Sequence, residues 1–193
     1  LPPRGSTGSR SADIVGSDPR RRFIVPSAPG KSPRHEKKIT DLLISLHDRA
    51  ARGADWERVF AAIAGRYLEI VRGLGLDLDL GPLLADVRKR VAGKASLAWT
   101  MSRGEFLSGK ILAGLLRVPF VDAAEVVRFG SHGQCDPVAT RRLLSRRLRR
   151  ARSAVIPGFY GALPDGRIAV FSRGGSDITG ALVAQAARAR VYE

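Results

Sequence analysis

The chain has 193 residues, of which 44% are hydrophobic, and a formal net charge of +15 at pH 7. This length suffices for one sizeable core, so we expect one main domain. One cysteine and three histidines exclude an internal disulfide and a zinc cluster, which fits a cytoplasmic setting. No apolar run approaches the roughly 20 residues of a membrane span, and the first residues lack the apolar core of a signal peptide.

The first half of the chain is predicted to form one short strand followed by helices. Residues 1–10, rich in Pro, Gly, Ser and Arg, have no periodicity and are expected to be disordered, and residues 11–15 resemble the last turn of a helix. The apolar run Phe23–Val25 is typical of a buried strand, and the loop 26–31 follows at the end of the strand where parallel sheets bind ligands. Apolar residues at helical spacing then predict helices over 39–46, 56–71, 83–91 and 97–116, with a break at Gly81-Pro82.

The second half alternates short strands and helices. Strands are expected at 119–121, 126–127 and 153–156, followed by a hairpin turning at 164–166, a helix over 177–187 and a strand beginning at 190–192. Strands that alternate with helices predict an α/β fold, a three-layer α/β/α sandwich around a mainly parallel sheet.

Seven arginines account for much of the positive charge and surround one predicted helix. They are Arg141, Arg142, Arg146, Arg147, Arg149, Arg150 and Arg152. The apolar residues between them, Val138, Leu144, Leu148 and Ala151, recur at helical spacing and predict a buried stripe. Because no stacking aromatic residues accompany the arginines, we interpret them as a solvated face and expect no nucleic-acid partner.

A glycine-containing loop, residues 172–181, precedes the last predicted helix. Its glycines allow close approach of a ligand, and the helix amides that follow can hold a carboxylate or a phosphate. An ordinary glycine turn with a Ser or Asp N-cap would have the same composition. Composition alone leaves both interpretations open.

Six segments, in order and at matching spacing over 20–193, resemble aspartate kinase of the amino-acid kinase family. They are Ile24–Lys31 (IVPSAPGK), Ile39–Leu43 (ITDLL), Ser102–Ser108 (SRGEFLS), Phe120–Glu125 (FVDAAE), Ile156–Gly161 (IPGFYG) and Phe171–Thr179 (FSRGGSDIT). The resemblance implies an amino-acid kinase-like fold. It also implies phosphorylation of the side-chain carboxylate of L-aspartate to 4-phospho-L-aspartate, using ATP and Mg²⁺, on the way to lysine, threonine and methionine.

The resemblance also implies roles for individual residues. Arg173 would bind the α-carboxylate of aspartate through two parallel hydrogen bonds, Glu105 would bind the ammonium group, and Asp177 would be the catalytic residue that orients cationic groups. The remaining matches are Ser27, Thr40, Phe159 and Ser176 in the substrate pocket and Gly174 and Gly175 in the anion loop; no metal ligand is expected. Taken alone, these residues would be interpreted as an exposed helix acid, caps, loop hydroxyls and core.

The chain also departs from the family pattern. Family members begin with a Lys-Phe-Gly-Gly loop that grips ATP phosphates, whereas residues 1–10 contain no such motif. A Trp-Thr-Asp segment and regulatory ACT domains are also absent, so 11–193 is expected to be a partial kinase domain with impaired catalysis. The alternative is a non-catalytic aspartate-binding or subunit-interaction remnant of the same fold. The expected partners are L-aspartate and ATP, and a homo-oligomer is left open.

Overall fold

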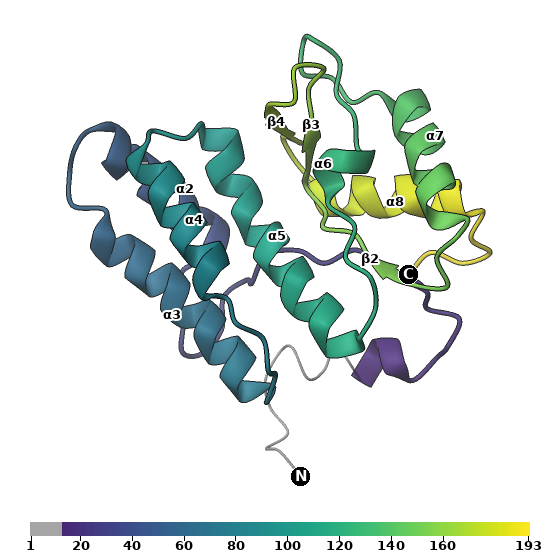
Figure 1. Ribbon diagram of the computed structural model, residues 1–193, viewed down its shortest axis with the longest axis horizontal. Helices are drawn as coiled ribbons and strands as arrows, with labels where there is room; N and C mark the ends of the chain where they lie inside the picture. The colour runs from purple at the N-terminus through teal and green to yellow at the C-terminus, as the bar shows by residue number, and fades with distance from the viewer. Residues whose placement is uncertain (1–12) are drawn as a thin grey trace.

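The computed structural model describes residues 13–193 (Figure 1). The expected disorder of residues 1–10, and residues 11–12 of the expected first helix, lie outside this range, and 13–16 form a helical turn. The named elements are β1 (Phe23–Ile24), α2 (Ile39–Ala51), α3 (Glu57–Gly73), α4 (Gly81–Ala92), α5 (Leu97–Leu116), α6 (Ala123–Val126), α7 (Pro137–Leu148), β2 (Ala154–Val155), β3 (Tyr160–Ala162), β4 (Ile168–Val170) and α8 (Gly175–Ala187).

A short parallel sheet lies between two groups of helices. β1 pairs in parallel with β2, with Phe23 opposite Ala154, and Phe120 bridges in parallel to Val155 from the other side. Ala154 and Val155 are fully buried, as expected for a parallel strand covered on both faces. β3 and β4 form the predicted antiparallel hairpin. The fold is therefore α/β with a small, mainly parallel central sheet.

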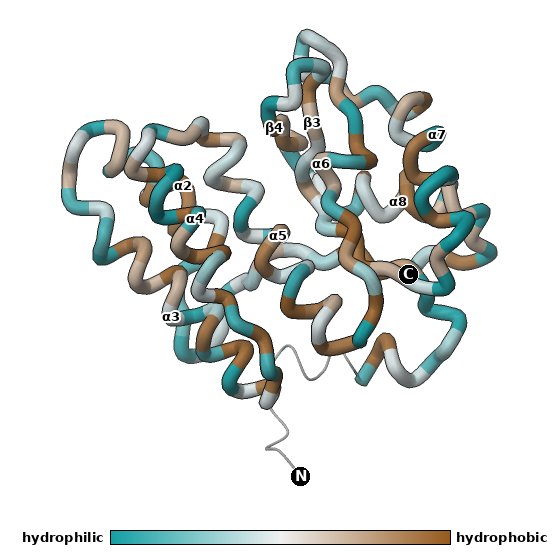
Figure 2. The backbone as a smooth tube through the Cα atoms, viewed as in Figure 1, coloured by the Kyte–Doolittle hydropathy of each residue, from teal (hydrophilic) through white to brown (hydrophobic). Residues whose placement is uncertain are grey.

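Helices flank the strands in two groups, each with its own apolar cluster. α2 to α5 lie on one side, and α6 to α8 lie with the strands on the other (Figure 1). The side chain of Phe106 on α5 packs against both clusters. In Figure 2, brown and teal segments alternate along α3, the amphipathic pattern that its sequence predicts. α5 therefore joins the helical cluster to the sheet.

Two of the predicted strands are wrong. Val126 belongs to α6 because the Asp122 carboxylate accepts a hydrogen bond from the amide of Ala124 at 2.9 Å and starts a helical turn. Residues 190–192 form no strand, and the hydroxyl of Tyr192 instead donates to the main-chain oxygen of Asp177 at 3.0 Å. Local capping and docking to α8 thus replace sheet pairing in these segments.

Two details of the helices also differ from the prediction. α4 begins at Gly81, not after the expected break, because proline fits the first turn of a helix, where its missing N–H is not needed. Val138 was expected in the buried stripe of the arginine-rich helix, but it is 68% exposed at the start of α7, whereas Leu144 and Leu148 are buried. All seven arginines of the cluster are exposed, as expected. Across 13–193, no helix combines the length and apolar character needed to cross a membrane.

Candidate functional site

Two loops meet at the carboxyl edge of the parallel sheet. The loop after β1 and the loop after β2 leave the sheet side by side, because parallel strands end at the same edge. The amide of Gly158 donates to the main-chain oxygen of Pro26 at 3.2 Å. This edge is where open α/β sheets bind ligands, and it brings the segment of Ser27 close to the segment of Phe159.

The start of α8 packs against the loop after β2. A Cβ atom on Gly158 would lie 2.6 Å from the Cα of Ser176, and one on Gly175 would lie 2.8 Å from the Cα of Phe159. These positions therefore require glycine. Gly174 has φ +58° and forms the N-cap of α8, a backbone conformation that glycine adopts without strain. The structure thus brings together four of the predicted residues: Phe159, Gly174, Gly175 and Ser176.

Phe159 itself has an unusual backbone. Its φ of +76° is in the left-handed region, which a bulky side chain rarely adopts. The amide of Phe171 donates to the main-chain oxygen of Phe159 at 2.9 Å and helps to hold it there. Such conformations are concentrated at ligand-binding segments. The sequence gives no sign of this strain, because a phenylalanine in an apolar stretch is typical of core.

Glu105 lies on α5 and is only 5% exposed, so its interpretation as an exposed helix acid is wrong. Its Oε1 accepts a hydrogen bond from the amide of Ala28 at 3.2 Å, and its Oε2 has no hydrogen-bond partner. Burial raises the pKa of this carboxyl from 4.5 to about 7, and the bond from Ala28 partly opposes the rise. A buried oxygen without a partner, beside a ligand-binding loop, can accept a hydrogen bond from a cationic ligand group.

Gly104 brings the loop and two helices close to Glu105. A Cβ atom at Gly104 would lie 2.9 Å from the Cβ of Ala28 and 3.4 Å from the Cγ2 of Ile39. Thr40, the next residue of α2, is half-buried in the first turn of that helix. The start of α2 therefore packs against the turn of α5 that carries Glu105.

The charged residues of the glycine loop are exposed. Arg173 lies in the turn before α8, and Asp177 lies in the first turn of the helix. Within 13–193, neither side chain makes a hydrogen bond or an ion pair. No hydrogen bond or ion pair of the described residues joins either of them to Glu105 or to Thr40, so the convergence of Arg173 and Thr40 on Glu105 remains a prediction.

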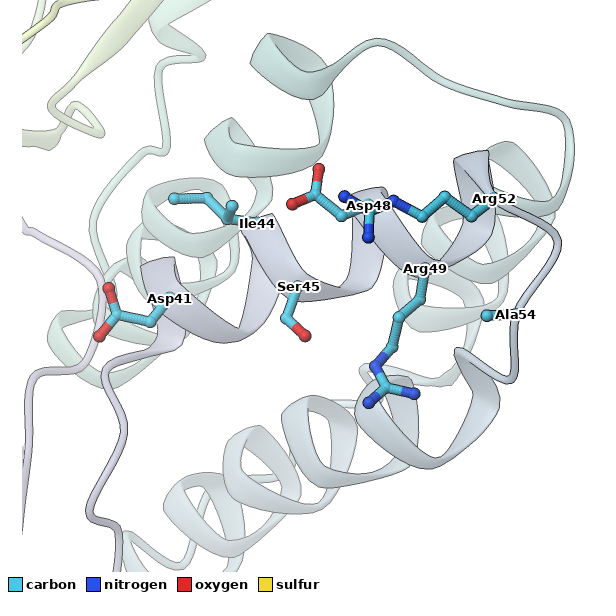
Figure 3. A pocket seen from close by; sticks show the side chains of 7 residues that line it. All are labelled: Asp41, Ile44, Ser45, Asp48, Arg49, Arg52 and Ala54. Atoms are coloured by element: carbon cyan, nitrogen blue, oxygen red, sulfur yellow. The ribbon is translucent and has the colours of Figure 1, made fainter.

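One surface hollow lies elsewhere, along α2 (Figure 3). It is lined by Asp41, Ile44, Ser45, Asp48, Arg49, Arg52 and Ala54. None of the predicted site residues lines it, and its charged side chains are exposed, where solvent screens them. A second hollow, between α7 and the β3–β4 turn, also lacks those residues. We therefore place the candidate site at the sheet edge, where polar groups are buried and the backbone is strained.

A metal ion in a protein requires a group of side-chain ligands that lie close together. Residues 13–193 contain no group of three or more His, Cys, Asp or Glu side chains arranged to hold an ion.

Sequence reasoning missed two neighbours of the site, Arg66 and Tyr67 on α3. Arg66 is 6% exposed and donates from Nη1 to the main-chain oxygen of Lys37 at 3.0 Å. Tyr67 is fully buried, and its hydroxyl donates to the main-chain oxygen of Gly104 at 2.7 Å. A detectable signal was an arginine three residues after Ile63, on the apolar face of a helix, where a charged side chain needs a buried partner.

Comparison with known proteins shows which proteins this chain resembles. No protein-family model matches the chain. Aspartokinase 3 of Bacillus subtilis is 32% identical over 93% of this chain and 43% of its own length, and lysine-sensitive aspartokinase 3 of Escherichia coli is 29% identical over 94% and 43%. The solved aspartate kinase of Clostridium acetobutylicum has a TM-score of 0.90 and 39% identity, with 93% of this chain and 42% of that chain covered.

A second solved relative is E. coli aspartokinase III, described in two complexes. In the R-state, with aspartate and ADP, it matches with a TM-score of 0.75 and 28% identity, over 94% of this chain and 44% of that chain. In the T-state, with lysine and aspartate, the TM-score is 0.67 at the same identity and coverage. This chain is thus similar to aspartokinases, and it spans less than half the length of the relatives it matches.

Proposed function

We propose that the protein to which this chain belongs transfers the γ-phosphoryl group of ATP to the side-chain carboxylate of L-aspartate, giving 4-phospho-L-aspartate. The observation that carries this proposal is Glu105, a buried carboxyl with an unpartnered oxygen inside the Ser-Arg-Gly-Glu segment, next to the loop of Ser27. Its setting suits the ammonium group of an amino acid. The relationship to aspartokinases supports the choice of aspartate.

The other site residues have complementary roles in this proposal. Arg173 binds the α-carboxylate of aspartate with its planar guanidinium. Asp177 is the catalytic residue and orients cationic groups around the transferred phosphoryl group. Thr40 completes the aspartate pocket with Ser27 and Phe159, which lie in the two loops at the sheet edge, and with Ser176, which lies in the first turn of α8.

The nucleotide enters the proposal at the start of α8. The amides of Gly174 and Gly175 lie at the positive end of a 13-residue helix, a setting suited to phosphate oxygens. E. coli aspartokinase III has been described with ADP. Mg²⁺ bound with ATP would neutralise charge on the phosphates, the main requirement of phosphoryl transfer. The Lys-Phe-Gly-Gly departure noted in the sequence falls in residues 1–10, outside the described range.

Finer features belong to the same proposal. They are a complete three-layer α/β/α sandwich, a role in lysine and threonine biosynthesis, a cytoplasmic location and a homo-oligomeric state. The two groups of helices around the central strands support the layered fold.

Isothermal titration calorimetry of the chain with L-aspartate tests the proposal. We expect binding by the unaltered chain and none by Glu105→Gln, and weak binding of succinate, which lacks the ammonium group. Arg173→Lys should weaken binding, whereas Arg188→Lys, an exposed arginine at the other end of α8, should not.

An assay of ADP release, with Mg-ATP and L-aspartate, separates the two functional interpretations. Turnover supports the kinase, and aspartate binding without turnover supports the aspartate-binding remnant. No binding of aspartate at any pH between 6 and 8.5 would overturn both.

A further inference from the structure

Two adjacent residues of α3, Arg66 and Tyr67, form hydrogen bonds to the two segments that meet at Glu105. Arg66 and Tyr67 are buried, and neither belongs to the segments that resemble aspartate kinase. Because neighbouring helical residues point about 100° apart, one reaches the loop after β1 and the other reaches α5.

Arg66 fixes the loop that connects Ser27 to α2. Its guanidinium donates to two main-chain oxygens, that of Lys37 at 3.0 Å and that of Gly30. These carbonyls lie seven residues apart in the chain, so a single planar side chain closes the loop between them. The amide of Ile39 donates to the main-chain oxygen of Pro29 at 3.0 Å and closes the same loop.

Tyr67 fixes the helix turn that carries Glu105. Its hydroxyl donates to the main-chain oxygen of Gly104 at 2.7 Å. No other residue of the described chain donates a side-chain hydrogen bond to this turn of α5 from another helix. The bond is fully buried, where a lost partner leaves a carbonyl without compensation.

The two anchored segments meet at one hydrogen bond. The amide of Ala28, in the loop that Arg66 closes, donates to the Oε1 of Glu105, beside the carbonyl that Tyr67 holds. This bond leaves Oε2 as the free oxygen. We propose that Arg66 and Tyr67 are positioning residues, which hold the loop and α5 so that the free oxygen of Glu105 points to the ammonium group of the substrate. The inference rests on the proposed binding of aspartate by Glu105.

Tyr67→Phe is the test, because it removes only the hydroxyl. We expect L-aspartate to bind about tenfold more weakly by calorimetry, since the affinity depends on the position of Glu105. The matched control is Thr140→Val, which removes a fully buried hydroxyl of α7 that accepts a hydrogen bond from the amide of Arg128 at 2.9 Å, in a helix that carries none of the site residues. It should lower the melting temperature similarly and leave aspartate affinity within twofold of the unaltered chain.

A second readout needs no ligand. The hydrogen bond from the amide of Ala28 lowers the pKa of the Glu105 carboxyl. If Tyr67→Phe displaces the α5 turn and weakens that bond, the titration of Glu105, followed by carbon-13 NMR, should move to higher pH. Arg66→Met should have the same two effects as Tyr67→Phe, and Arg66→Lys should restore part of the affinity.

The outcomes separate the inference from the proposed function. If the unaltered chain binds aspartate, Glu105→Gln does not, and Tyr67→Phe binds normally with an unmoved titration, the positioning role is refuted and the function stands. If Glu105→Gln binds as well as the unaltered chain, the proposed function fails and the inference fails with it.

Discussion

Glu105 should make the folded chain less stable as the pH rises. Burial raises the pKa of its carboxyl from 4.5 to about 7, so the folded chain holds a proton that the unfolded chain has lost between these two values. Unfolding then releases a proton, and the free energy of unfolding falls as pH increases through this window. One pKa unit is worth about 1.4 kcal/mol, so ionising Glu105 costs the folded chain about 3 kcal/mol, of which about 2.5 kcal/mol falls between pH 5 and pH 8.

Urea unfolding of the unaltered chain and of Glu105→Gln at pH 5, 6, 7 and 8 measures this cost. The free energy of unfolding of Glu105→Gln relative to the unaltered chain should increase by about 2.5 kcal/mol over that range, because glutamine does not ionise. Glu125→Gln, which changes an exposed glutamate on α6, is the control and should show a constant difference. Parallel curves for Glu105→Gln would refute the buried, raised carboxyl. Added L-aspartate should stabilise the unaltered chain more at pH 8 than at pH 5.5, since only the ionised carboxylate pairs with an ammonium group.

Three further predictions concern the packing around the site and α7. Gly158→Ala should destabilise the chain by about 1–3 kcal/mol, because the added Cβ would lie 2.6 Å from the Cα of Ser176. Gly65→Ala in α3 should instead stabilise the chain, because nothing lies within 4 Å of its added Cβ. Chemical denaturation compares the two variants. Leu144→Ala should cost about 2–5 kcal/mol, and Val138→Ala, at a 68% exposed position, should cost little; equal losses would mean that the predicted stripe was right. Asp136→Ala should lower stability by about 1 kcal/mol, because its carboxylate accepts from the amides of Val138 and Ala139 at the start of α7; an unchanged melting temperature would contradict this.

Periodicity predicted the helices better than the strands. α5 begins and ends at the predicted residues, 97 and 116, because its apolar pattern extends over five turns. The strands are two or three residues long, so a single capping interaction decides their limits. Asp122 shows this, since its bond to the amide of Ala124 starts a helical turn that includes Val126, a residue predicted as strand. A short apolar run in the sequence does not show whether helix capping or strand pairing will prevail.

Some features of the candidate site could be predicted from the sequence and others could not. The sequence segments predicted Glu105, Phe159 and Ser176 as site residues, and the structure packs the segments of the last two against each other at Gly158 and Gly175. Burial of Glu105 was not predictable, because a glutamate within a helix is typically exposed. Its burial depends on Gly104, whose missing side chain lets the Ala28 loop approach, a contact between segments 76 residues apart in the chain.

The surroundings of Glu105 are held in place by two residues of another helix, Arg66 and Tyr67 of α3. α5 supplies the carboxyl, but its Oε1 is held by a loop amide, and that loop is closed by Arg66. A loop of this length would otherwise have many conformations, and ordering it costs about 1–2 kcal/mol per residue in backbone entropy. Because Arg66 and Tyr67 lie on one rigid helix, the loop and the α5 turn are fixed relative to the same frame. In the proposed site, aspartate would bind without having to order the loop, which is the physical advantage of a preorganised site.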